Sequence, residues 1–270
     1  MQWNPSFKTV ILLCVLCLNA CTEDPLTEFP ELTADHEGDV ADFRMTTYNI
    51  HGGNGPNGEG DFGSNLTAFH ELTMGELILC MQEVEPDDWN ELRSIFAEYP
   101  HRFYLPQCST KFGTNKQGGN AILSKLPIIQ YDHALINTDP GGDKWERKAQ
   151  YLKFYVGHGA THLNLFHYHN TYNWHHNGSE AERQGFERFA DWVLSKEIPS
   201  NEMLIITGDF NLSKAQCDAI LLNRFTHYTG NWVDHIYGNS PLLDQGIYNT
   251  VGLMLSDHQA VWAVVCNDGC

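Results

Sequence analysis

Several short apolar runs in this chain have strand character and stop at a carboxylate, a carboxamide or an imidazole. One of them begins at Ile205, stops at Gly208 and is followed by Asp209 and Asn211. Side chains alternate along a strand, so residues two positions apart can point into the same space. A strand that leaves through an Asp or Asn turn is common, so this motif alone hardly favours a function.

The same arrangement recurs elsewhere in the sequence. Asn49 ends a strand-like run before a glycine turn, Glu83 closes an apolar run, and the pair Asp257 and His258 precedes another. Carboxylate and amide oxygens suit Mg²⁺ or Ca²⁺, whereas zinc prefers sulfur and nitrogen ligands. Ordinary turns do not readily explain why so many expected strands end in such residues. We therefore expect a binding site for a hard cation.

Strand and helix patterns alternate along the chain. We expect strands over residues 43–50, 77–84, 102–106, 120–124, 148–156, 162–169, 203–208, 232–237 and 259–266. Helical patterns begin at Pro86, at Ser179, where Glu182 completes a capping box, and over residues 213–225. The middle helix carries an apolar stripe of Phe186, Phe189, Ala190, Val193 and Leu194. Residues 52–63 and 170–178 are expected as loops. This interleaving predicts layered α/β packing.

Together these motifs resemble the endonuclease/exonuclease/phosphatase superfamily, which has the fold of the pancreatic-type deoxyribonucleases. The matching blocks follow the family's order across residues 43–266. They are Thr47–Gly53, Met81–Val84, Gly119–Ile128, Leu163–Asn170, Thr207–Asn211, Val233–Tyr237 and Ser256–His258. The resemblance implies an α/β fold, a four-layer sandwich of two packed mixed β-sheets flanked by helices. It also implies a metal-dependent phosphodiesterase.

The resemblance places a metal site at three of the strand ends. Glu83 is expected to be the main ligand of Mg²⁺, with Mn²⁺ or Ca²⁺ as alternatives, and Asn49 and Asp257 to complete its inner or outer shell. A single carboxylate with water in the remaining positions is a usual Mg²⁺ arrangement.

Hydrolysis of a phosphodiester requires charge neutralisation, an activated water and a protonated leaving group. By resemblance, Asp209 positions or deprotonates the attacking water, and Asn211 holds a phosphate oxygen. His258 is expected to contact the phosphoryl oxygens, while Asp234 fixes its ring through a hydrogen bond.

One expected strand supplies two further histidines, His167 and His169, which share a face by alternation. The family's catalytic histidine lies at the end of this strand, so His169 is expected as the acid and as a substrate contact, with His167 as the alternative. Asn120 stands near the place where pancreatic-type enzymes carry a glutamate that partners this histidine. It matches the broader family pattern and is expected to bind phosphate or organise the site. Arg147 and Lys148 are candidate phosphate contacts, although a solvated strand start is the simpler interpretation.

The first 42 residues are read as a targeting segment and a linker. Residues 1–20, with Lys8 before a short apolar run, are expected to be a lipoprotein signal peptide, and Cys21 the lipidated residue. Residues 21–42 are rich in Asp and Glu, contain no Lys or Arg, and are expected to be an acidic tether. Residues 43–270 then form one catalytic domain. We expect a monomer held at a membrane that faces the periplasm or the cell exterior.

Cysteine usage leaves the disulfide pairing open. Cys80 lies inside an apolar strand and is expected to be a buried free thiol. Any pairing among Cys108, Cys217, Cys266 and Cys270 is undetermined by spacing.

Charge bears on the substrate. The chain of 270 residues has a formal net charge of −18, which repels polyanions at long range and argues against a tight, non-specific DNA binder. The first expectation is an exported nuclease that acts on extracellular nucleic acid. A phosphoesterase of lipid or inositol phosphates and a non-catalytic surface binding protein are the alternatives.

Overall fold

The structure is a computed structural model that describes residues 25–28, 42–53, 61–108, 117–138, 146–157, 162–172, 180–222 and 224–266. The expected signal peptide, the lipidated Cys21 and most of the expected tether lie outside these residues. Within the described ranges, no helix is long and apolar enough to cross a membrane.

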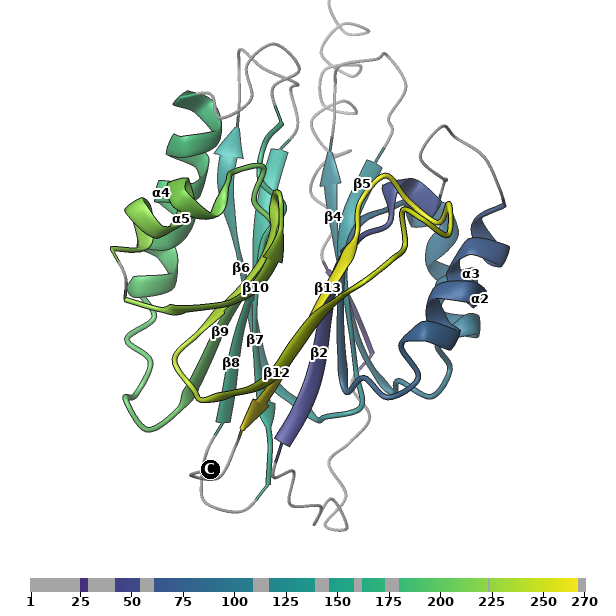
Figure 1. Cartoon of the computed structure of the whole chain (residues 1–270), viewed down its shortest axis with the longest axis horizontal. Coiled ribbons are helices and arrows are strands. Elements are labelled where there is room, and N and C mark those ends of the chain that lie inside the picture. Colours follow the sequence, from purple (N-terminus) through teal and green to yellow (C-terminus); the bar gives the residue numbers. More distant parts are fainter. Residues whose placement is uncertain are drawn as a thin grey trace, which may run out of the picture.

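Two β-sheets pack face to face through the middle of the molecule (Figure 1). The first has seven strands in the order β1–β4–β5–β3–β2–β13–β12. Its strands are β1 (Leu26–Glu28), β2 (Asp42–Asn49), β3 (Ile78–Val84), β4 (His101–Cys108), β5 (Gln117–Ser124), β12 (Leu242–Tyr248) and β13 (Ala260–Cys266). Strands β2 and β3 run parallel, whereas β13 pairs antiparallel with β2, so the sheet is mixed.

The second sheet has six strands in the order β10–β11–β9–β8–β7–β6. Its strands are β6 (Ile128–Thr138), β7 (Glu146–Tyr155), β8 (His162–His167), β9 (Met203–Asp209), β10 (Thr226–Asn231) and β11 (Asp234–Gly238). Strands β8 and β9 run parallel, and β11 is antiparallel to β9, so this sheet is mixed as well.

Helices cover the outer faces of both sheets (Figure 1). Helices α2 (Phe62–Leu72) and α3 (Trp89–Ile95) flank the first sheet, and α4 (Glu180–Leu194) and α5 (Lys214–Leu221) flank the second. Short 3₁₀ turns, η2 (His51–Gly53) and η3 (Pro86–Asp88), follow β2 and β3. The predicted four-layer sandwich of two mixed sheets is confirmed.

Helix α4 shows how the sequence pattern produces this layer. Phe186, Phe189 and Val193 are buried, as the predicted stripe requires. The prediction is wrong for Leu194, the last member of that stripe, because this residue lies at the end of the helix and is 42% exposed. The helix predicted over residues 213–225 ends at Leu221, because Leu222 adopts a left-handed backbone with φ 51°.

The space between the sheets changes character along the strands. At one end the facing side chains are apolar, among them Met45, Ile122 and Leu165. Two residues further along β2 and β8, Thr47 and His167 stand on the same faces and are fully buried. Still further along, these faces end in the polar residues of the candidate site. The apolar core therefore supports the polar groups from beneath.

The strands that sequence analysis missed are β1, β6, β10 and β12, and each lies at an edge of its sheet. Helix α2 was also missed, because the expected loop runs up to its first turn. Strand β1 lies within the expected acidic tether. There Glu28 accepts a hydrogen bond of 2.8 Å from Arg102 on β4 and also pairs with Arg93. Residues 26–28 therefore belong to the folded sheet and are not a solvated linker.

Two of the cysteine expectations can be compared with the structure. Cys80 is a buried free thiol, as predicted, and Cys217 is also buried and free. Cys266 is disulfide-bonded.

Candidate active site

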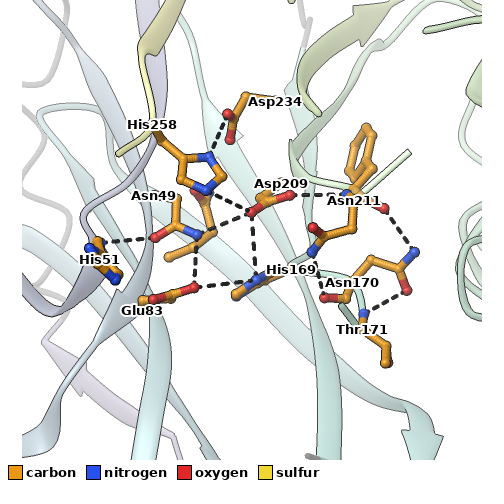
Figure 2. A network of polar contacts seen from close by, with 12 residues as sticks. Asn49, His51, Glu83, His169, Asn170, Thr171, Asp209, Asn211, Asp234 and His258 are labelled. Carbon is orange, nitrogen blue, oxygen red and sulfur yellow. Dashed lines mark hydrogen bonds and ion pairs between the residues drawn. The ribbon is translucent and has the colours of Figure 1, made fainter. Parts of the chain in front are cut away.

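The two sheets bring their polar strand ends together at one end of the interface between them (Figure 2). Asn49 is the last residue of β2, and Asp209 is the last residue of β9. Asp234 opens β11, directly opposite Asp209 in the antiparallel register. His258 lies two residues before β13, and His169 lies two residues after β8. The fold thus gathers residues that are far apart in sequence.

Asp209 is the centre of this cluster. Its Oδ2 accepts a hydrogen bond of 3.1 Å from Asn49 Nδ2, and its Oδ1 accepts one of 3.0 Å from the backbone N–H of Asn211. The same Oδ2 lies 3.6 Å from His169 Nε2 and 3.8 Å from His258 Nε2. One carboxylate oxygen therefore faces both imidazoles (Figure 2).

Glu83 stands beside this oxygen but closer to solvent. Its Oε1 accepts a hydrogen bond of 2.9 Å from Asn49 Nδ2 and lies 3.8 Å from His169 Nε2. The Glu83 side chain is 39% exposed, whereas that of Asp209 is 2% exposed. Asn49 thus links the exposed carboxylate of Glu83 to the buried carboxylate of Asp209.

Unusual backbone conformations hold these groups in place. Glu83 and Asn211 have left-handed φ values of 58° and 50°, which side-chain-bearing residues adopt rarely. Gly208 has φ 145°, and a Cβ there would lie 1.9 Å from the carbonyl oxygen of Tyr168. Only glycine allows β9 to approach the end of β8 so closely, which explains the glycine before Asp209.

The segment before β13 is tied to β2 by Ser256. The Ser256 hydroxyl donates a hydrogen bond of 2.8 Å to the backbone carbonyl of Asn49, and the backbone N–H of His258 donates to this hydroxyl at 3.1 Å. The Ser–Asp–His motif therefore holds His258 against the end of β2.

The neighbours of His258 favour its cationic form. Its Nδ1 lies 2.8 Å from Asp234 Oδ2, within hydrogen-bonding distance. Burial opposes charging of the ring, but the charge and hydrogen bond of Asp234, together with Asp209, raise the pKa of His258 well above its ordinary value. Asp234 lies where a ring-orienting carboxylate was expected.

Burial and the nearby charge of Asp234 raise the pKa of Asp209 to about 6, although His258 and the hydrogen bond from Asn49 act against this shift. A carboxylate with a pKa of this size can take up a proton near neutral pH. Asp209 is therefore suited to act as a base.

His169 has the opposite electrostatic surroundings. Burial, followed by the charge of Arg147, lowers its pKa well below the ordinary value. The terminal nitrogen Nη1 of Arg147 lies 3.2 Å from His169 Nδ1. His169 thus occupies the expected place, but its surroundings disfavour the cationic form required of an acid. His258 is the better candidate for carrying a proton.

His167, the alternative to His169, is a core residue. Its Nδ1 lies 2.7 Å from Gln150 Oε1, and its Nε2 lies within hydrogen-bonding distance of the Gln82 amide. The ring is fully buried, and burial lowers its pKa to about 3. Both ring nitrogens are engaged beneath the site, which leaves the outer position to His169.

Arg147 and Asn120 are both buried near the site. Arg147 is only 6% exposed, so the interpretation as a solvated strand start is wrong. Lys148 is 9% exposed. Asn120 is fully buried, and neither polar atom of its side chain has a hydrogen-bonding partner among the residues that the structure describes. An unsatisfied buried amide is costly and is typical of a group that awaits a ligand or water.

Asn211 and Asp257 lie at the margins of the cluster. The Asn211 amide donates to the backbone carbonyl of Asn170 at 3.2 Å. Asp257 Oδ1 lies 4.0 Å from His258 Nε2 and 3.5 Å from His51 Nδ1, and its side chain is 46% exposed. Asp257 therefore belongs to the exposed side of the site with Glu83.

Asn170 is a structural residue that the sequence did not single out. It is fully buried, and its amide donates to the backbone carbonyls of Glu182 and Phe210, each at 2.8 Å. It thereby joins the loops that follow β8 and β9. Nothing in its local sequence distinguishes it from an ordinary loop asparagine.

A cation could bind at either of two places in the site. Within the described part of the chain, Asp209, Asp234 and His258 form a group of acidic and histidine side chains close enough to share a metal ion. However, Asp234 and His258 use facing atoms to bind each other. Glu83 is more accessible, and its second oxygen is not used in the bond from Asn49. An accessible carboxylate of this kind fits Mg²⁺.

Asn49 fits only an outer role at such a site. Its Oδ1 accepts a hydrogen bond of 2.9 Å from the backbone N–H of His51, so the amide nitrogen must face Glu83 and Asp209. That nitrogen is a donor and cannot ligate a cation. Asn49 therefore orients the two carboxylates.

The family profile described as Endonuclease/Exonuclease/phosphatase family matches residues 46–258, which include every polar strand end of the site. The chain belongs to this family. Its members are hydrolases that act on phosphodiester bonds. No curated protein matches the chain.

Several solved structures have the same fold. An endonuclease/exonuclease/phosphatase from Beutenbergia cavernae DSM 12333 is 15% identical, with a TM-score of 0.66, and the match covers 84% of this chain and 72% of that one. The corresponding Bacteroides vulgatus protein is 18% identical, with a TM-score of 0.61 and coverage of 83% and 98%. TDP2 from D. rerio, solved with a single-strand DNA product, is 13% identical, with a TM-score of 0.63 and coverage of 83% and 98%.

Proposed function

We propose that this chain is an exported, divalent-metal-dependent phosphodiesterase that hydrolyses nucleic acid by attack of water on phosphorus. The observation that carries the proposal is the position of Asp209 Oδ2, which lies 3.6 Å from His169 Nε2 and 3.8 Å from His258 Nε2. A base flanked by two imidazoles at a polar strand end matches the needs of phosphoryl chemistry.

Each residue then has a defined task. Asp209 takes a proton from the attacking water while the new oxygen–phosphorus bond forms. The bond from phosphorus to the leaving oxygen breaks, and that oxygen takes the proton that His258 carries. Asp234 holds the His258 ring and stabilises its charge. Asn49 keeps Asp209 in place through its 3.1 Å hydrogen bond.

A Mg²⁺ ion held by Glu83 would neutralise charge on the phosphate, and Mn²⁺ or Ca²⁺ are alternatives. Asp257 lies on the same exposed side and is proposed as a contact through water. Asn211 and Asn120 are proposed to hold phosphate oxygens. For Asn120 the support is its buried side-chain amide, which has no hydrogen-bonding partner in the described part of the chain.

The choice of substrate rests on opposing observations. The TDP2 structure with a DNA product supports nucleic acid as the substrate. The net charge of −18 repels a long polyanion and so favours a small substrate, such as a phospholipid or an inositol phosphate, as the second candidate.

A direct assay separates these candidates. Purified protein is incubated with DNA, RNA, sphingomyelin and phosphoinositides, each with Mg²⁺ and with EDTA. We expect EDTA-sensitive cleavage of nucleic acid. Cleavage of a lipid alone would establish the second candidate. Absence of metal-dependent turnover on all four would contradict the enzyme and favour a binding protein.

Export and membrane attachment are also part of the proposal. Their support is the sequence of residues 1–21, in which a short apolar run precedes Cys21. The Cys21→Ser variant should leave the membrane fraction or accumulate unprocessed. Unchanged partitioning into detergent would contradict lipidation and favour ordinary secretion.

A further inference from the structure

The unusual feature of this site is the partner of His169. Arg147, on β7, is buried, and its Nη1 lies 3.2 Å from His169 Nδ1 and 3.4 Å from Gln107 Oε1. Arginine therefore stands on the side of the imidazole that faces away from Asp209. A carboxylate in that place would have the opposite chemical effect.

The direction of this hydrogen bond follows from the chemistry of the two groups. A guanidinium has N–H donors and no acceptor, so it can only donate. The facing Nδ1 of His169 must accept, and it therefore carries no hydrogen. In the neutral ring the hydrogen is then on Nε2. This atom lies 3.6 Å from Asp209 Oδ2 and 3.8 Å from Glu83 Oε1.

His167 provides an internal comparison two residues earlier. Gln150 Nε2 donates to the backbone carbonyl of Asn120 at 2.9 Å, which turns the Gln150 oxygen toward His167 Nδ1. A carbonyl oxygen only accepts, so His167 carries its hydrogen on Nδ1. Two histidines only two residues apart are thus held in opposite tautomers.

We infer that Arg147 is a positioning residue, which holds His169 as the Nε2–H tautomer so that this hydrogen points at the substrate phosphate. His169 then donates a hydrogen bond to a phosphoryl oxygen, while His258 with Asp234 supplies the proton. The role in turnover rests on the proposed function, but the tautomer does not. The sequence lacks the glutamate that partners this histidine in pancreatic-type enzymes, and Arg147 contacts the ring instead.

The tautomer can be measured without substrate or metal. Long-range ¹H–¹⁵N NMR of ¹⁵N-labelled protein distinguishes protonated from unprotonated ring nitrogens, and a His169→Gln variant assigns the signals. We expect His169 in the Nε2–H form in the wild type and in Arg147→Lys, because lysine also only donates. In Arg147→Met no guanidinium keeps the hydrogen off Nδ1, so the Nδ1–H form should become detectable beside the Nε2–H form. A wild-type ring protonated on Nδ1 would overturn the inference even if Arg147→Met does not fold.

Kinetics test the consequence for catalysis. If the preferred phosphodiester is cleaved, kcat of Arg147→Met should fall roughly 10- to 100-fold with little change in KM, and Arg147→Lys should restore much of it. Arg188→Met is the control, because Arg188 donates to the Ile136 carbonyl and the Asn137 side chain instead of to a histidine. Unchanged kcat in Arg147→Met would overturn the inference. A correct tautomer in a protein without any turnover would instead contradict the proposed function.

Discussion

Glu83 and Asp209 are carboxylates joined by one asparagine, yet their surroundings suit them to different chemistry. Glu83 is 39% exposed and can exchange water for a cation, whereas Asp209 is 2% exposed and has its pKa raised to about 6. Accessible carboxylates suit cation binding, and buried ones suit proton transfer. Burial, more than residue type, separates the two roles.

This difference predicts the effect of Glu83→Gln. The substitution keeps the size of the side chain but removes the charge, so Mg²⁺ affinity should fall roughly 10-fold or more. Isothermal titration calorimetry measures the affinity directly. Glu71→Gln, at an exposed position of α2, is the matched control and should bind as the wild type does. Equal Mg²⁺ affinity in Glu83→Gln and wild type would contradict the assignment of Glu83.

Residues at strand ends could be recognised from the sequence because the signal is local. Asp209 and Asn211 follow an apolar run directly, and Asp257 and His258 precede one. Arg147 could not be interpreted in the same way. Its burial and its contacts with Gln107 and His169 depend on packing between different strands of the two sheets. No local pattern distinguishes it from a solvated arginine.

At the scale of elements, the sequence predicted the central strands and missed the edges. Every predicted strand has a neighbour on both sides, whereas β1, β6, β10 and β12 end their sheets. An edge strand is covered less completely, so its sequence lacks a continuous apolar run. Strand β12 has no buried residue, and β6 exposes Tyr131 and Leu135. The pairing of edge strands depends on a sheet that already exists.

The close approach of β8 and β9 predicts a cost for Gly208→Ala. A Cβ would meet the Tyr168 carbonyl oxygen at 1.9 Å in a backbone with φ 145°. We expect a loss of about 3–5 kcal/mol in the free energy of unfolding. Urea denaturation measures it.

Gly75→Ala is the matched control for this variant. A Cβ at Gly75 meets nothing within 4 Å. Its stability should remain within about 1 kcal/mol of the wild type. Equal stability of Gly208→Ala and Gly75→Ala would contradict the close approach.

At the scale of the whole molecule, Glu76 links stability to pH. It is buried and accepts a hydrogen bond of 2.7 Å from the Tyr248 hydroxyl on the edge strand β12. Burial raises its pKa from 4.5 to about 7, although Tyr248 and Arg44 act against the shift. Between these values the folded state keeps a proton that the unfolded state has lost. The contribution of Glu76 to the free energy of unfolding therefore falls as the pH rises from about 4.5 to above 7.

We predict how the free energy of unfolding of Glu76→Gln differs from that of the wild type, measured by urea denaturation at pH 5 and pH 8. Relative to wild type, Glu76→Gln should gain up to about 3 kcal/mol on going from pH 5 to pH 8, because it has no proton to lose. Glu197→Gln, at an exposed position, should follow the wild type. A difference between Glu76→Gln and wild type that does not change with pH would contradict the raised pKa.

The central claim is that Asp209 and His258 act together on one phosphodiester, although β9 and the segment before β13 belong to different sheets. A double-mutant cycle of kcat/KM on the substrate found in the assay tests it most directly, with the exposed His133→Ala as control. Asp209→Asn and His258→Ala should each reduce kcat/KM by roughly 10³-fold or more, and the double variant should be within about 10-fold of the worse single variant. Retention of activity in either single variant, or losses that multiply in the double variant, would contradict the claim.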